Sequence, residues 1–167
     1  MYALEAHTDG RTAEFPCGGF LQPYAGIHPM KDRAELGKKS WGGFWLWLAG
    51  YGGACQAVGW LPLPEVAVVR ILLNLTAWAL VLLGYIILCT ERVYWYNGVS
   101  YAQASAAGSG RRKAFAQKHL HRFRQFALGF LLFTALSCLL GWSAWVDTTV
   151  FCCGLMAAAF STVGFRL

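Results

Sequence analysis

Arg70 is the residue whose chemistry most needs an explanation, because it lies inside the long apolar run of residues 66–90. A charged side chain within a membrane-spanning helix is costly, and it is usually paired or functional. Asn74 follows one helical turn later, so the two side chains share one face of a helix. Together with Glu65 and Asp147, which flank apolar runs, they predict a small polar pocket at one membrane surface that suits an anion or a lipid headgroup.

A simpler interpretation of Arg70 is purely structural. Its long side chain can extend to the membrane surface and pair there with Glu65 or Asp147. An Arg70→Leu variant that folds and functions normally would exclude the pocket, and so would an Arg70 side chain that faces lipid.

A second group of charged residues lies in the middle of the chain. The stretch of residues 111–126 repeats apolar side chains at helical spacing, and most of its other positions are basic. This pattern predicts a basic amphipathic helix that leads into a membrane span and lies on anionic lipid headgroups. A docking surface for an acidic partner protein is the alternative. The candidate contact residues are Arg111, Arg112, Lys113, Lys118, Arg122 and Arg124.

No motif for catalysis or cofactor binding accompanies these residues. The sequence contains no Gly-rich phosphate loop, no HExxH, no GxSxG and no pair of carboxylates within its apolar runs. His119 and His121 are two positions apart, a spacing that turns helical side chains to different faces. We therefore expect no catalytic residue, no cofactor and no metal site.

Four apolar runs position the polar residues. They extend over residues 41–61, 66–90, 126–145 and 148–165. About 20 helical residues cross the hydrocarbon core of a bilayer, and backbone groups in lipid must be hydrogen-bonded within the segment. Each run is therefore predicted to be a transmembrane helix. Charged residues make up only 13% of the chain, about half of their share in a soluble domain.

Short connections predict that the four helices form two antiparallel hairpins. The first turn contains Pro64, which suits the start of a helix, and the second is predicted at Val146–Asp147, with Asp147 as a helix cap. Lys and Arg cluster before the first span, in the loop of residues 91–125 and after the last span, whereas the two turns contain none. The positive-inside rule therefore places both termini and this loop in the cytoplasm. The predicted class is an all-α integral protein of a bacterial cytoplasmic membrane.

The chain divides into a tail and one membrane domain. Residues 1–29 show no helical or strand period and lack the apolar core of a signal peptide. We interpret them as a disordered tail, or as an upstream extension if translation begins at Met30. Residues 30–167 are the single four-helix domain.

These features favour a non-catalytic function. The leading hypothesis is a partner, scaffold or accessory subunit of a membrane complex, or a homo-oligomer. The alternative is a minimal oligomeric transporter or channel with the region of Arg70 and Asn74 at its outer mouth. A lipid-acting membrane enzyme is the third hypothesis, although no nucleophile and base are recognisable. The net charge of +6 clusters beside apolar runs, which indicates the lipid bilayer and not nucleic acid as the partner.

Overall fold

The protein is described by a computed structural model over residues 39–96, 98–165 and 167. These residues form helices and no strand, and the interpretation of residues 1–29 lies outside them. In chain order the elements are α1 (Gly42–Gly59), α2 (Glu65–Thr90), the 3-10 helix η1 (Val93–Trp95), α3 (Tyr101–Ala106), α4 (Ser109–Leu140) and α5 (Ala144–Val163).

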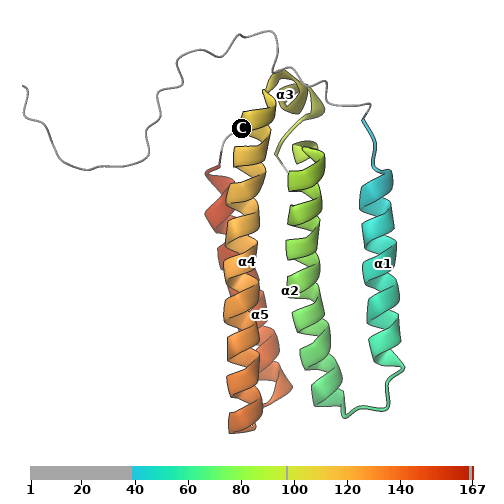
Figure 1. Cartoon of the computed structure of the whole chain (residues 1–167). Coiled ribbons are helices and arrows are strands. Elements are labelled where there is room, and N and C mark those ends of the chain that lie inside the picture. Colours follow the sequence, from blue (N-terminus) through green and yellow to red (C-terminus); the bar gives the residue numbers. More distant parts are fainter. Residues whose placement is uncertain (1–38, 97, 166) are drawn as a thin grey trace, which may run out of the picture.

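Helix α2 is central to the arrangement. It packs against α1 on one side and against α4 and α5 on the other, while α1 has its main helical contact with α2 (Figure 1). The α1–α2 turn and the α4–α5 turn lie at one end of the molecule, and η1 and α3 lie at the opposite end (Figure 1). We call these the turn end and the loop end.

Three of the helices, α2, α4 and α5, are long and apolar enough to cross a membrane. The predicted helical class is confirmed, and these three helices have the length and apolar composition that a membrane span requires. Helix α1 does not belong to this set. Its 18 residues include six glycines and Gln56, which dilute its apolar side chains, so a fourth span stays a prediction.

The turn between α4 and α5 lies earlier than the sequence predicted. Helix α4 ends at Leu140, because Gly141 takes the left-handed conformation (φ 66°) and its N–H binds the carbonyl of Ser137. Helix α5 begins at Ala144, so the predicted span of residues 126–145 was wrong at its end. Asp147 is not a cap in the connection but a side chain in the first turn of α5.

The basic segment and the third predicted span form one helix. Helix α4 is continuous over 32 residues, about 48 Å at 1.5 Å per residue. The apolar face of its first half is covered by the protein, since Phe115 and Ala116 pack in a cluster with Ile87, Val93 and Tyr94. The prediction that this face lies on lipid is therefore wrong for these residues.

A second core cluster joins the three apolar helices nearer the turn end. Ala77 of α2, Ala127 and Phe130 of α4 and Phe151 of α5 are buried together. Close packing continues at Gly154 of α5, since a Cβ atom built there would lie 2.8 Å from the ring of Phe126.

A Gly154→Ala substitution is expected to destabilise the α4–α5 contact. The added methyl group overlaps the Phe126 ring, which is itself packed against Phe151, and overpacking of this kind costs about 1–3 kcal/mol. The measurement is thermal unfolding of the full chain in mild detergent. Gly129→Ala is the matched control, because no atom lies within 4 Å of a Cβ there. Equal melting temperatures for the two variants would contradict the packing described.

Candidate functional site

The Arg70 side chain joins three elements at the turn end. Its Nε donates to Oδ2 of Asp147 at 2.7 Å. Its Nη2 donates to Oγ of Ser137 at 3.0 Å and to the carbonyl of Trp142 at 2.7 Å, and Nη1 donates to Sγ of Cys138 at 3.4 Å. The Asp147 side chain is completely buried. One guanidinium group from α2 thus holds the end of α4, the turn after it and the first turn of α5.

Asn74 forms a second connection one turn further along α2. Its Nδ2 donates to the carbonyl of Arg70 at 2.9 Å and to Oγ1 of Thr134 at 3.1 Å. Its Oδ1 is buried and has no hydrogen-bond partner among the described residues. The structure therefore brings together three of the four residues predicted for the polar pocket, namely Arg70, Asn74 and Asp147. Glu65 is exposed and forms no ion pair within the described part of the chain.

A groove of about 740 Å³ lies beside this connection, between α2 and α4. Arg70, Asn74 and Thr134 contribute its polar lining, and the remaining lining is largely apolar, including Trp78 and Leu131. Every nitrogen of the Arg70 guanidinium already donates to a protein acceptor. The geometry therefore matches the structural interpretation of Arg70, in which its charge is neutralised by Asp147.

A second charged cluster, built on Glu91, lies at the loop end and was not predicted from the sequence. This residue caps α2 in a left-handed conformation (φ 55°). Its Oε2 accepts from Nη2 of Arg112 at 2.7 Å, and its Oε1 accepts from the Ser109 hydroxyl at 2.6 Å and lies 3.3 Å from Nζ of Lys113. Glu91 is the only carboxylate between residues 66 and 146. A single carboxylate between an apolar run and a basic stretch is the feature of the sequence that could have predicted an ion pair here.

Arg112 also fastens the segment that follows η1. Its Nη1 donates to the carbonyl groups of Ala104 and Ala107 in and just after α3, and its side chain is only 2% exposed. The sequence prediction of Arg112 as a surface contact residue is therefore wrong. Its charge is directed inward, where the carboxylate of Glu91 and two carbonyl groups neutralise and solvate it.

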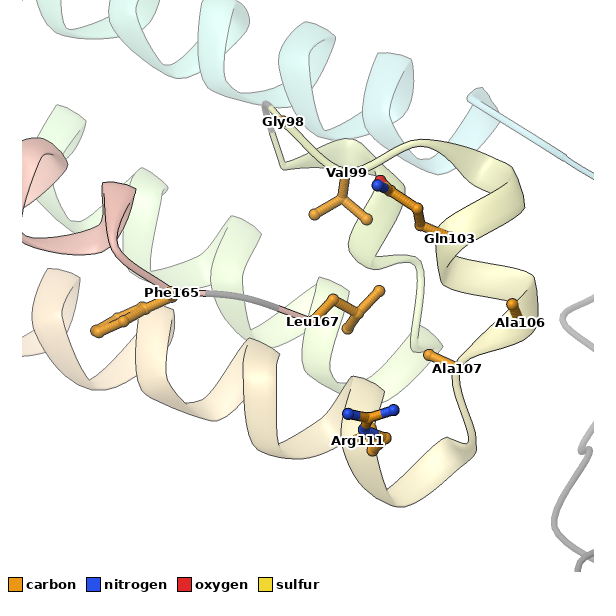
Figure 2. A pocket seen from close by; sticks show the side chains of 8 residues that line it. All are labelled: Gly98, Val99, Gln103, Ala106, Ala107, Arg111, Phe165 and Leu167. Atoms are coloured by element: carbon orange, nitrogen blue, oxygen red, sulfur yellow. The ribbon is translucent and has the colours of Figure 1, made fainter.

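The other predicted contact residues lie on the surface of α4. Lys113 is exposed beside Glu91. Arg111, Lys118, Arg122 and Arg124 are exposed and form no ion pair within the described residues. Arg111 also lines a cavity of about 460 Å³ at the loop end, which Figure 2 shows together with the C-terminal Phe165 and Leu167.

The two histidines occupy different environments. His119 is buried, its Nδ1 lies 3.0 Å from the Phe115 carbonyl, and its ring stacks on Tyr96 with 4.3 Å between centroids. His121 is exposed. No group of three His, Cys, Asp or Glu side chains suitable for a metal ion occurs in the part of the chain that the structure describes.

Comparison with known protein families, with curated proteins and with solved structures gives no match to this chain. Its function is therefore inferred from the geometry of its own residues.

The Arg70–Asp147 pair is expected to behave as a coupled unit. An Arg70→Met variant leaves a buried carboxylate without its partner, and an Asp147→Asn variant removes the charge that the guanidinium needs, so each lowers the melting temperature. The double variant is expected to lower the melting temperature by less than the sum of the two single-variant decreases. A double-mutant cycle on the full chain in detergent measures this difference, and strict additivity would contradict the pairing.

The Glu91 cluster is expected to make the loop end sensitive to acid. Burial by itself would raise the pKa of Glu91, but hydrogen bonds from Ser109, Arg112 and Lys113 outweigh it and lower the pKa. A carboxyl group with a lowered folded-state pKa contributes stability above its ordinary pKa of about 4.3, and the contribution is lost as the pH falls through the folded value.

Hydrogen exchange of the backbone amides in α3 tests this expectation between pH 6 and pH 3 after correction for intrinsic rates. Protection in the unmodified protein is expected to fall over the acid part of the range. A Glu91→Gln variant is expected to start with less protection and to lose less of it. Parallel pH profiles for the two proteins would contradict the role of Glu91.

Proposed function

We propose that this chain is a membrane protein without a catalytic role, acting as a partner, scaffold or accessory subunit of a membrane complex, and that α1 supplies the contact surface. The observation that carries the proposal is the exposure of α1. None of its 18 residues is buried, whereas α2, α4 and α5 share a core. A helix held this way adds little to the stability of the domain and is available to another protein.

One face of α1 attaches it to α2. The indole Nε1 of Trp47 donates to the carbonyl of Ala79 at 3.2 Å, and the hydroxyl groups of Tyr51 and Thr76 lie 2.8 Å apart. Near the loop end, a Cβ on Gly43 would meet the ring of Trp95 at 3.0 Å. These contacts fix the orientation of α1, so its opposite face is presented in a defined direction.

The opposite face carries Trp45, Ala49, Gly53 and Gln56, at positions i, i+4, i+8 and i+11 of the helix. All four are exposed, and nothing lies within 4 Å of a Cβ built on Gly53. Small residues let two helices approach closely in a membrane, and an amide side chain can hydrogen-bond across such a contact. A face with two small residues and an exposed amide is better matched to another helix than to lipid tails.

The proposal includes α1 as a fourth span and both termini in the cytoplasm of a bacterium. Helix α1 lies alongside α2, and the two turns share one end of the molecule (Figure 1). Apart from Arg70, the described Lys and Arg residues are Lys39, just before α1, and those from Arg92 to Arg124. The positive-inside rule would place the loop end in the cytoplasm.

A transporter with its outer mouth at Arg70 and Asn74 receives less support. The nitrogens of the Arg70 guanidinium donate to protein acceptors, and Asn74 Nδ2 donates to Thr134. These bonds leave few donors for a passing solute.

A Gly53→Leu variant tests the contact surface. The added side chain keeps α1 apolar but prevents the close approach of a second helix. The amount of a partner protein that co-purifies with the chain in mild detergent is therefore expected to be at least tenfold lower for the variant than for the unmodified chain. Gly129→Leu is the matched control, since Gly129 on α4 is also exposed and has nothing within 4 Å. Equal recovery of the partner with both variants would contradict the proposal, and so would an unmodified chain that purifies without any partner.

A further inference from the structure

The packing of α4 on α2 sets the level of the basic residues along the helix bundle. A Cβ on Gly84 would lie 3.3 Å from Cδ1 of Leu120 and 3.6 Å from its Cα, so these two residues are at the same level. Gly84 precedes the end of α2 at Thr90 by six residues, about 9 Å of helix. Residues near Leu120 therefore lie beside apolar helix and not beyond it.

Helix α5 gives the same level independently. The rings of His119 and Phe165 have centroids 5.1 Å apart, and Phe165 follows the last residue of α5, Val163. Phe123 and Phe160 line one cavity between α4 and α5. The segment from Lys118 to Arg124 is therefore level with the last turn of α5, where its apolar stretch ends.

Three exposed cations occupy this level: Lys118, Arg122 and Arg124. The only carboxylate side chains in the described part of the chain are those of Glu65, Glu91 and Asp147. Glu91 is occupied by Arg112 and Lys113, and the other two belong to the turn end. The three cations thus carry positive charge that no described side chain balances.

We propose that Lys118, Arg122 and Arg124 bind the phosphate groups of anionic lipids in the leaflet at the loop end. Arg124 lies four residues beyond Leu120, about 6 Å closer to the membrane centre, and a long arginine side chain spans that distance back to the level of Leu120. Charge complementarity identifies the occupant, because an anionic leaflet attracts basic residues at its surface. This inference is independent of the partner surface on α1.

The other cations of α4 are placed differently, which supplies a control. Arg111 and Lys113 precede Leu120 by nine and seven residues, about 10–14 Å further from the membrane centre. Lys113 is engaged by Glu91, and Arg111 lines the cavity at the loop end beside Leu167 (Figure 2). Substituting Arg111 and Lys113 removes the same number of charges as substituting Arg122 and Arg124, but from a position further from the membrane centre.

Native mass spectrometry of the purified full chain tests the proposal. The protein in mild detergent is titrated with phosphatidylglycerol and, separately, with phosphatidylcholine. For each lipid the association constant of the first bound molecule is measured, and the ratio of the phosphatidylglycerol constant to the phosphatidylcholine constant is taken. The unmodified chain is expected to prefer phosphatidylglycerol. Each basic residue near an anionic headgroup is worth about fivefold in affinity. Arg122→Gln with Arg124→Gln is therefore expected to lower the ratio by at least tenfold, and Arg111→Gln with Lys113→Gln by less than threefold.

Equal losses in the two double variants would overturn the proposal, and so would an unmodified chain without preference, as expected if the basic residues instead serve an acidic protein. If the variants do not fold, the unmodified chain is titrated again in high salt. Screening shortens the reach of charge to about 3 Å at 1 M salt, so the preference for phosphatidylglycerol is expected to weaken severalfold. A preference that salt does not change would contradict binding through these charges.

Discussion

The antiparallel contact of α2 with α4 is the interaction on which the rest of the structure depends. It is apolar in the middle, where Ala77 and Ala127 are buried, and it is tied by charge at both ends. Arg70 of α2 holds the turn end, since it donates to Ser137 of α4 and pairs with Asp147 of α5. Glu91 after α2 holds the loop end through Arg112 of α4. A shift of α4 along α2 would leave these charges without their partners in a buried environment, which is costly. The two sets of interactions therefore fix the register of α4 on α2.

That register determines what the remaining surfaces present. Because α4 is continuous and aligned with α2, its basic stretch begins beyond the apolar part of the bundle and continues beside it, down to Arg124. The same register brings the turn after Gly141 to Arg70, so that α5 folds back onto α4. Helix α1 takes no part in either tie. It rests on α2 through a few aromatic and hydrogen-bonded contacts, and its other face is left uncovered.

Much of this arrangement could be predicted from the sequence, because long apolar runs and short turns leave few alternatives to helical hairpins. The cost of a charge in an apolar run predicted an acidic partner for Arg70, either Glu65 or Asp147, and the structure pairs it with Asp147. The start of α5 was misplaced because Gly141 ends α4 through its left-handed conformation, while the apolar pattern continues unbroken past it. The burial of Arg112 was not predicted because a basic helical pattern indicates an exposed helix face. Its partner Glu91 lies 21 residues away in the chain, so the local pattern does not reveal the pair.

The central claim is that the bundle crosses a membrane with both turns on one side and the loop end on the other. Cysteine accessibility in intact cells tests it most directly, using single cysteines at Leu63 and Trp142 in the turns, and at Ser100 before α3, in a chain whose native cysteines are replaced. A membrane-impermeant thiol reagent is expected to label positions 63 and 142 from outside, and position 100 only after permeabilisation. Labelling of the two turns from opposite sides, or of position 100 in intact cells, would contradict the account.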